Sequence, residues 1–380
     1  MNESGQHKVM VVTGTRAEFG LLRPVMHAIH RHPELMLYVV AAGSHLVQPA
    51  VTFREVKAEF AIADSIPMQT AGKVGRLHDV ESLGKGIARF GRCYDMNSPD
   101  MVVVLGDRIE AFAAASAASV GGVPLAHIHG GDRAEGVADE AMRHAITKLA
   151  HVHFPATQTS GDRIIRMGED PSRVFVAGSP AIDGLDAINP LGQGAFSELG
   201  SPEVVVLMHP IGREDPTEAQ AMRHVLEAVS DMRVLVLHPN LDPGRRGIMK
   251  VIDSAPIDVQ VHDGLPRDVF VGLLKRVGAS GGVLVGNSSA GLIEAAAIGC
   301  PSVDIGDRQG GRERCDGWTA HADESVDSIR EAIGLVIDPG TARGGHPYGD
   351  GQSGELIAGH IAAVLAQADR DSLRRKRCAF

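Results

Sequence analysis

The 380-residue sequence predicts an α/β protein built from two Rossmann-like, doubly wound domains. Three observations support this fold class. The chain is longer than one hydrophobic core usually supports. Short apolar runs alternate with amphipathic helical patterns from end to end, as in a parallel sheet covered on both faces. The pattern is interrupted once, by the Gly-, Pro- and Ser-rich segment Asp186–Ser201, which we interpret as a linker.

In the first half, the segment Lys8–Thr13 (KVMVVT) is apolar almost throughout, which is typical of a buried parallel strand. The further strands that we expect are Leu35–Ala42, Met101–Leu105, Val123–Ile128 and Arg173–Val176. The helices that we expect are Glu18–His32, Arg108–Ser119, Glu140–Ala150 and Ser160–Met167. Together they predict an N-terminal domain over residues 1–185, with the linker at 186–201.

The second half repeats the alternation, which predicts a second domain over residues 202–355. Its expected strands are Val204–Met208, Arg233–Leu237, Ile257–Val261, Val283–Val285 and Ser302–Ile305. Its expected helices are Thr217–Val229, Arg267–Arg276 and Ala290–Gly299. Asp323–Val336 and Ser353–Asp371 are further helical patterns, and we interpret the basic end Arg374–Arg377 as solvated.

Composition excludes several classes of protein. A net charge of −10 argues against a general nucleic-acid binder, which needs a basic surface. The four cysteines form no CxxC pair, so neither a disulfide framework nor a zinc site is indicated. The sequence contains no apolar run of about 20 residues, the length that a membrane-spanning helix needs. We therefore expect a cytoplasmic protein without membrane or nucleic-acid partners.

Polar residues follow several of the predicted strands, where the cleft between two such domains would lie. After the first strand, Gly14-Thr15-Arg16 leads into a helix. This segment is either an anion site with Arg16 as donor or a plain turn. After Met101–Leu105 stands Asp107, which either caps the next helix or serves a site.

The densest group of titratable residues follows Val123–Ile128. His129 and Asp132 flank a Gly-Gly turn, and Asp139 and Glu140 begin the next helix. The HExxH and HxxxH spacings typical of metal sites are absent, so acid–base chemistry is favoured over metal binding. In the second half, His209 and His238 each end a strand.

Asn287-Ser288-Ser289 joins a strand to a helix through small polar residues. We interpret it as a diphosphate cradle rather than a plain helix cap, with Glu294 one turn further on. The polar glycine loop at 306–312, which contains Arg308 and Arg312, is interpreted as a flexible lid on the sugar side. We also count His45, Asn240 and His262 among the candidate substrate or nucleotide contacts.

The motifs from about residue 8 to 314 resemble the hydrolysing UDP-N-acetylglucosamine 2-epimerase family of the sialic- and legionaminic-acid pathways. The similar segments include GTRAEFGLLRP, AAGSHL, LGDRIEA, HIHGGDRAEG, DEAMRHAITKLAHVHF, VAGSPAID, HPN, GNSSAGLIEA and IGDRQGGR. The resemblance implies a glycosyltransferase-B-like fold, with the nucleotide held by the second domain. It also implies that a C-terminal helix at 356–380 crosses back to the first domain, and that the protein is a homodimer.

The resemblance further implies a two-stage reaction on a nucleotide-activated N-acetylated amino sugar, without an organic cofactor or obligatory metal. A base removes the C2 proton as the diphosphate leaves C1, and water then adds to the resulting glycal. By position, Asp107 and Asp139 match catalytic carboxylates, and His209 matches a histidine near the diphosphate. The positions that match nucleotide contacts are Arg16, Ser288, Ser289 and Glu294.

His129 departs from the family pattern, because many members carry a glutamate there. It can still serve as acid or base, or a neighbour such as Asp132, Glu135 or Glu140 has taken over. Leu21 or Leu22 replaces a lysine typical of the non-hydrolysing relatives, which favours hydrolysis. A non-hydrolysing epimerase, a glycosyltransferase on the same fold and a silent nucleotide-sugar sensor remain the alternatives.

Overall fold

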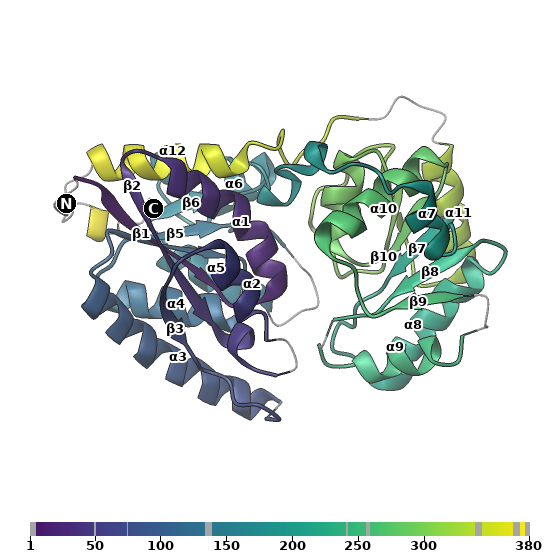
Figure 1. Ribbon diagram of the computed structural model, residues 1–380, viewed down its shortest axis with the longest axis horizontal. Coiled ribbons are helices and arrows are strands. Elements are labelled where there is room, and N and C mark those ends of the chain that lie inside the picture. The colour runs from purple at the N-terminus through teal and green to yellow at the C-terminus, as the bar shows by residue number, and fades with distance from the viewer. Residues whose placement is uncertain are drawn as a thin grey trace. The chain divides into compact units, whose positions relative to one another are not determined.

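The computed structural model describes residues 5–48, 51–73, 75–133, 139–240, 242–255, 259–338, 344–367 and 373–376. They form two compact units (Figure 1). The first unit extends to Asp183 and takes the chain back from Gly349 onward. The second begins at Gly184 and ends at Tyr348. Each unit contains one parallel sheet with flanking helices, so the fold class predicted from the sequence is confirmed.

The described part of the first unit holds a six-stranded sheet with the order β3-β2-β1-β4-β5-β6, the order of a Rossmann fold. Its strands are β1 (His7–Thr13), β2 (Leu35–Ala42), β3 (Ile62–Ile66), β4 (Met101–Leu105), β5 (Leu125–Ile128) and β6 (Val152–Phe154). Its helices are α1 (Arg16–Arg31), α2 (Phe53–Glu59), α3 (Arg76–Asn97), α4 (Ile109–Val120), α5 (Asp139–Leu149), α6 (Gln158–Arg166) and α12 (Ser353–Gln367).

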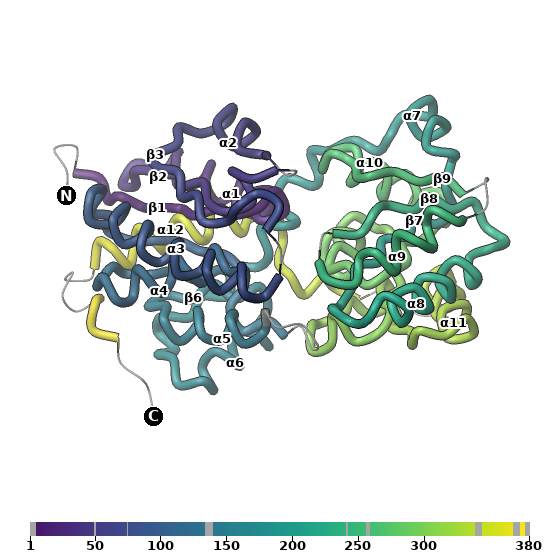
Figure 2. The backbone as a smooth tube through the Cα atoms, turned by 90° about the horizontal axis from the view of Figure 1, so that it is seen from below, coloured from purple at the N-terminus to yellow at the C-terminus, as the bar shows by residue number. Residues whose placement is uncertain are grey.

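Successive residues of the first strand enter two different cores. Val9 and Val11 belong to the core under α1 and α12, whereas Met10 and Val12 belong to the core under α3 and α4. Neighbouring side chains of a strand point to opposite faces, so an apolar run such as KVMVVT needs helices on both sides. Figures 1 and 2 show these two helix layers around the first sheet.

The C-terminal helix returns to the first unit, as the resemblance implies. Ile357 of α12 is buried in the same core as Leu22 of α1. The start of α12 is fixed by the carboxylate of Asp183, which accepts the N–H groups of Ser353 at 3.0 Å and Gly354 at 2.7 Å. The helix therefore begins at Ser353, where the helical pattern Ser353–Asp371 predicted it.

The second unit repeats this architecture. Its strands are β7 (Val204–Leu207), β8 (Val234–Leu237), β9 (Gln260–His262), β10 (Val283–Gly286), β11 (Ser302–Ile305) and β12 (Thr319–Ala322). Its helices are α7 (Gln193–Glu198), α8 (Asp215–Ala228), α9 (Arg245–Ile252), α10 (Arg267–Ala279) and α11 (Val326–Ile337), with a π-helical turn at Gly291–Ala295. Counted from β7, the order β12-β11-β10-β7-β8-β9 is that of the first sheet.

The segment 186–201, interpreted as a linker, contains α7, whose Phe196 is buried in the same core as Val205 of β7. One expectation about local structure is wrong, because Arg173–Val176 is not a sheet strand. It contributes one isolated bridge, from Val174 to His153, and the sixth strand of the sheet is β6.

The basic C-terminal segment is anchored at Lys376 rather than solvated. Its ammonium group lies 2.8 Å from the carboxylate of Glu169, which is 3% exposed. The same group donates to the carbonyl oxygens of Thr147 (3.2 Å), Lys148 (2.5 Å) and Ala150 (2.6 Å). A cation at this end of α5 satisfies carbonyls that the helix leaves without partners. No helix in the described ranges has the length and apolar character needed to cross a membrane.

Candidate active site

Each sheet has one point where the strand order reverses, between β1 and β4 and between β7 and β10. In open parallel sheets, ligands bind at the carboxyl ends of the strands at this point. Arg16 and Asp107 follow β1 and β4, and His209 and Ser288 follow β7 and β10. The candidate residues chosen from the sequence therefore stand at the expected edge of each sheet.

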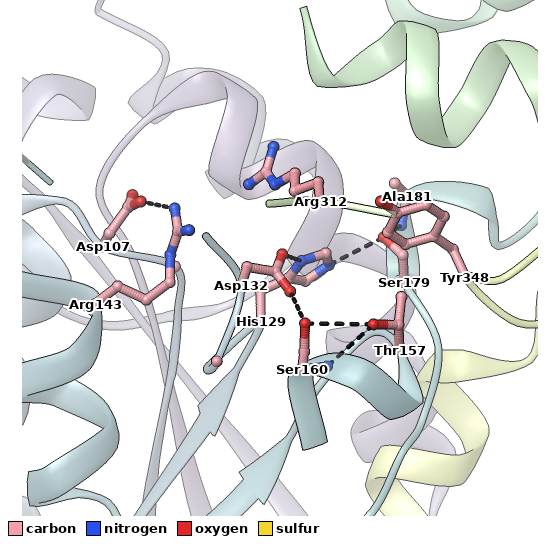
Figure 3. A network of polar contacts seen from close by, with 12 residues as sticks. Asp107, His129, Asp132, Arg143, Thr157, Ser160, Ser179, Ala181, Arg312 and Tyr348 are labelled. Atoms are coloured by element: carbon pink, nitrogen blue, oxygen red, sulfur yellow. Dashed lines mark hydrogen bonds and ion pairs between the residues drawn. The ribbon is translucent and has the colours of Figure 1, made fainter. Parts of the chain in front are cut away.

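Asp107 follows β4 and directs its carboxylate at Arg143 of α5 (Figure 3). The pair joins Asp107 Oδ2 to Arg143 Nη2, and both side chains are largely buried. Asp107 does not cap the following helix, because Arg108 occupies the N-cap position of α4. A charge-assisted contact of this kind holds the carboxylate in a fixed orientation at the edge of the sheet.

Two further acidic candidates begin α5. Oε1 of Glu140 lies 3.4 Å from Nε2 of His144 one turn later, and both side chains are partly exposed. Asp139 is the first residue of α5, but its side chain and residues 134–138 lie outside the described part of the chain. Acidic residues are favourable in the first turn of a helix, so this placement alone is compatible with a structural or a catalytic role.

His129 takes part in a buried row of polar side chains, drawn in Figure 3. Its Nδ1 lies 3.0 Å from Oδ2 of Asp132, and its Nε2 lies 3.0 Å from Oγ of Ser179. The second carboxylate oxygen of Asp132 accepts the hydroxyl of Ser160 at 2.8 Å. The backbone of His129 has a φ of +60°, which is uncommon for a residue other than glycine. The row therefore holds His129 in a backbone conformation that it would not adopt readily on its own.

His127, two residues earlier, is a structural histidine. Its Nε2 lies 2.7 Å from the carbonyl of Gly106, and its Nδ1 lies 3.2 Å from Oγ1 of Thr147. Burial lowers the pKa of His127 to about 3, so the ring stays neutral at physiological pH. Its neutral ring ties β5 to the turn that carries Asp107.

His45, which we expected to contact substrate or nucleotide, is held by protein groups on both ring nitrogens. The side chain is fully buried, and its two ring nitrogens lie 3.0 Å from Oγ1 of Thr13 and 2.6 Å from Oγ1 of Thr52. Burial also lowers the pKa of His45 to about 4. Arg16, in contrast, is 60% exposed at the start of α1, with Nε 3.6 Å from the carboxylate of Glu55. An exposed guanidinium at a helix N-terminus can reach an anion.

In the second unit, His209 is fixed by the backbone of a neighbouring strand end. The N–H of Asn240 donates to its Nδ1 at 3.1 Å. Burial, with a smaller contribution from the charge of Arg308, lowers the pKa of His209 to about 3. A neutral ring that accepts at Nδ1 carries its proton on Nε2. His209 is therefore held as a neutral Nε2–H donor, a form suited to an oxygen of a diphosphate.

The Ser-rich segment after β10 enters a helix as expected, but with an unusual turn. Ser288 Oγ accepts the N–H of Ala290 at 3.4 Å, so Ser288 does act as a local cap, and Ser289 follows in the first turn. The helix continues as a π-helical turn at Gly291–Ala295, which contains Glu294. π-turns inside helices are frequent at functional sites. Glu294 lies 3.8 Å from Arg267, and its side chain is 14% exposed.

The loop at 306–312 is tied to β10 rather than free. Arg308 Nη1 and Gln309 Nε2 donate to the carbonyl of Asn287 at 3.1 and 2.8 Å. Arg312 Nη1 in turn lies 2.5 Å from Oε1 of Gln309, which is 1% exposed. A buried glutamine thus anchors the centre of the loop, and its role as a sugar-side lid stays a prediction.

The remaining candidates stand at the ends of β8 and β9. His238 Nδ1 lies 3.0 Å from the carboxylate of Asp263, and the N–H of His238 donates to the carbonyl of His262. Asn240 Nδ2 donates to Asp242 at 2.5 Å, in the turn before α9. Across the described residues, no three His, Cys, Asp or Glu side chains come together as a metal site would require.

Residues 27–362 match the model of the family described as UDP-N-acetylglucosamine 2-epimerase. The chain belongs to this family. It is 33% identical to a Legionella pneumophila protein named UDP-N,N'-diacetylbacillosamine 2-epimerase (hydrolyzing), over 92% of this chain and 93% of that one. A Campylobacter jejuni protein named GDP/UDP-N,N'-diacetylbacillosamine 2-epimerase (hydrolyzing) is 29% identical, over 81% of this chain and 83% of that one.

Solved structures of this epimerase family have the same fold. The Neisseria meningitidis UDP-GlcNAc 2-epimerase bound to UDP-GlcNAc superimposes with a TM-score of 0.79. The identity is 20%, and the match covers 94% of this chain and all of that one. At this identity the likeness establishes the fold, the glycosyltransferase-B-like pair of Rossmann domains, and no more.

Several residues that build these sites were not among the candidates chosen from the sequence. Arg143 lies in the segment DEAMRHAITKLAHVHF, four residues after Asp139, but only the fold brings it to Asp107. Ser179 lies 50 residues from His129, a separation that no local pattern detects. Asn287 follows a strand like the other candidates and could have been found by that signal.

Proposed function

We propose that this epimerase-family enzyme is a hydrolysing 2-epimerase of a nucleotide-activated N-acetylated amino sugar. Its substrate is UDP-GlcNAc or a UDP- or GDP-linked 2,4-diacetamido-trideoxy hexose. The products are a free sugar of the ManNAc type and a nucleoside diphosphate, formed through a glycal. Such a free sugar would feed nonulosonic acid biosynthesis.

One observation carries the hydrolysing part of the proposal. Relatives that match most of this chain at 33% and 29% identity both bear the word "hydrolyzing" in their names. The resemblance adds that Leu21 or Leu22 stands where the non-hydrolysing relatives typically have a lysine.

We propose that the first unit, residues 1–185 in the sequence-based division, supplies the acid–base groups. The carboxylate of Asp107 is oriented by Arg143 and can take the C2 proton while the diphosphate leaves C1. Asp139 and Glu140 at the start of α5 are the further carboxylates, and His129 is the acid that returns a proton to C2. Arg16 adds positive charge for the departing diphosphate.

We propose that the second unit, residues 202–355 in the same division, binds the nucleotide. The neutral Nε2–H of His209 and the segment from Ser288 to Ser289 supply donors to the diphosphate without the desolvation cost of a buried charge. Glu294 accepts from ribose hydroxyls. The side chains of His238, Asn240 and His262 at the ends of β8 and β9 and those of Arg308 and Arg312 are the further contacts.

The experiment is a panel of UDP- and GDP-linked amino sugars incubated with the enzyme, with release of nucleoside diphosphate followed by phosphorus NMR. We expect one member to give stoichiometric nucleoside diphosphate and free 2-epimer. Formation of a nucleotide-linked 2-epimer without nucleotide release would instead identify the non-hydrolysing reaction. Nucleotide release only in the presence of a sugar acceptor, without epimerisation, would identify a glycosyltransferase.

A further inference from the structure

Three side chains of the first unit form one continuous hydrogen-bonded row. Ser179, His129 and Asp132 are 0%, 6% and 2% exposed, and each contact along the row is 3.0 Å. His129 and Asp132 flank the Gly-Gly turn after β5, whereas Ser179 is the N-cap of the short helix Pro180–Ile182. A histidine between a carboxylate and a hydroxyl is an arrangement that can hold and move a proton.

The carboxylate end of the row sets which ring nitrogen is always protonated. Asp132 accepts the Ser160 hydroxyl on Oδ1 and faces His129 Nδ1 with Oδ2. The Ser160 hydroxyl is committed to Asp132, because its own oxygen already accepts from Thr157. An ionised carboxylate can only accept, so Nδ1 of His129 carries a proton whether the ring is neutral or charged.

The hydroxyl end of the row serves both protonation states of the ring. Ser179 Oγ accepts the N–H of Ala181 at 3.2 Å, which leaves its own hydrogen free to donate to His129 Nε2 when the ring is neutral. When Nε2 is protonated, the same oxygen can accept from it. His129 can therefore gain or lose the Nε2 proton without leaving a buried nitrogen unpaired.

His127 provides an internal comparison in the same strand. Its Nε2 faces the carbonyl of Gly106, which can only accept, and the described residues place no carboxylate within hydrogen-bonding distance of its ring. Burial keeps the His127 ring neutral in one tautomer. The row around His129 differs in both respects, because Asp132 stabilises an imidazolium and Ser179 tolerates either state.

We propose that Asp132 and Ser179 are positioning residues that make His129 the proton donor of the first unit. This inference rests on the proposed function, in which a proton returns to C2. With substrate bound, the imidazolium exchanges its Nε2 contact with Ser179 for one with C2 and gives C2 that proton, and the new C–H bond takes the electron pair of the glycal double bond. Water bonds to C1 and loses its proton to one of the proposed catalytic carboxylates of the first unit. The ring is left neutral, with Nδ1–H still held by Asp132.

Asp132→Asn tests the role of the carboxylate. An asparagine can offer its NH2 group to Nδ1 and no longer stabilises the imidazolium, so we expect kcat to fall by roughly 10²–10⁴-fold, the size of a general acid contribution. KM should change little. The alkaline limb of the pH–rate profile should move to lower pH, because the ring loses its proton more easily. Among the described residues of the first unit, the titratable or charged groups near the row include His127 of β5 and Arg163 of α6, which bonds to the carbonyl of Gly131.

Ser179→Ala and a matched control complete the kinetic test. Alanine removes the partner of Nε2 but not the carboxylate, so we expect a loss of about tenfold in kcat, smaller than that in Asp132→Asn. Asp170→Asn changes another carboxylate of this unit that accepts from a serine, Ser172, and should leave kcat and KM unchanged. An Asp132→Asn enzyme with wild-type kcat and pH profile would overturn the proposal.

A measurement without turnover separates this inference from the proposed function. Nitrogen-15 NMR of labelled histidine should show the wild-type His129 ring protonated at Nδ1 at all pH values, with Nε2 gaining its proton as the pH falls. In Asp132→Asn the Nδ1 proton should no longer be fixed. A neutral wild-type ring protonated at Nε2 alone would overturn the inference. If NMR shows the expected Nδ1 proton but the enzyme epimerises no nucleotide sugar, the proposed function is overturned and the inference about His129 stands.

Discussion

Asn287 and His209 hold the ends of β10 and β7 together through two hydrogen bonds that run in opposite directions. The N–H of His209 donates to Oδ1 of Asn287 at 2.7 Å, and Nδ2 of Asn287 donates to the carbonyl of His209 at 2.8 Å. Asn287 is 2% exposed. One amide side chain thus fixes the position of His209 at the point where the second sheet reverses its strand order.

Replacing Asn287 with alanine should weaken both the second unit and its nucleotide site. Two part-buried backbone groups of His209 lose their partners, at about 1–2 kcal/mol each. We expect the free energy of unfolding in urea to fall by about 2–4 kcal/mol, and UDP binding measured by calorimetry to weaken about tenfold. Gln220→Ala on the exposed face of α8 is the control. Unchanged stability and UDP affinity in the Asn287 variant would contradict the anchoring role.

Asp107→Asn should remove turnover while nucleotide binding persists. The amide keeps the shape of the side chain but cannot accept the C2 proton, so we expect kcat to fall by roughly 10²–10⁴-fold. UDP affinity should stay within about threefold of wild type, because we assign the nucleotide to the second unit. Asp162→Asn, at an exposed position of α6, is the matched control. Near-wild-type turnover of Asp107→Asn would refute its role as base.

Glu18 predicts a pH dependence of stability. Its Oε2 accepts the N–H of Gly14 at 2.7 Å, and its own N–H donates to Oγ1 of Thr15. Burial, aided by the nearby charge of Glu110 and opposed by the Gly14 hydrogen bond, raises the pKa of Glu18 from 4.5 to about 8. A raised carboxyl pKa means that the folded state binds the proton more tightly than the unfolded state. The stability from Glu18 is therefore fully present below about pH 4.5 and lost as pH rises through about 8.

The upper part of this loss, between pH 7 and 8, lies above the pH range in which the buried histidines change charge and is therefore the part to measure. His45, His127 and His209 have lowered pKa values and are neutral there in both states, so they add no slope. We expect the free energy of unfolding in urea to fall over this range in wild type. Glu18→Gln, which mimics the protonated group, should make the curve flatter. An equal slope in both proteins would contradict the assignment.

Lys376→Met should loosen the end of α5. The substitution keeps the side-chain length but removes the cation that meets Glu169 and three carbonyls, so we expect a loss of about 1–3 kcal/mol in urea unfolding. Arg375→Met removes a neighbouring exposed charge and should change stability by less than about 0.5 kcal/mol. An equal loss of unfolding free energy in the two variants would contradict a specific contribution of the Lys376 contacts to stability.

The sequence predicted the central strands well because their signal is strong. Lys8–Thr13, Leu35–Ala42 and Met101–Leu105 are apolar runs buried on both faces, and the structure places strands there within one residue. Short or polar elements escaped detection. β6 has only three residues, and β12 (Thr319–Ala322) has no continuous apolar run. Patterns of that length cannot be distinguished from loops by periodicity.

The helix inside the segment interpreted as a linker escaped detection for a related reason. Gly, Pro and Ser make up six of the sixteen residues 186–201, yet two apolar side chains, Phe196 and Leu199, are enough to bury α7 in the second core. Composition reports the average of a segment, whereas packing depends on where its few apolar residues point. The same limit applies to Lys376, because nothing local indicates its distant carboxylate partner.

At the sites, the sequence indicated which strand ends carry chemistry but not which side chains meet. Asp107 and His209 lie at the edges predicted for them. A histidine after a strand looks the same in sequence whether it faces a ligand or, as His45 does, two threonine hydroxyls. The partners of Asp107 and His129, namely Arg143 and Ser179, are distant in sequence and become neighbours only through the fold.

The hydrolysing 2-epimerase reaction is tested most directly by one incubation in heavy-isotope water. The nucleotide sugar that reacts in the substrate panel is converted in D2O enriched in oxygen-18, and the products are read by NMR and mass spectrometry. We predict a free 2-epimeric sugar with deuterium at C2 and oxygen-18 at C1, together with unlabelled nucleoside diphosphate. A nucleotide-linked product, or a free sugar that keeps its original C2 proton, would contradict the proposed chemistry.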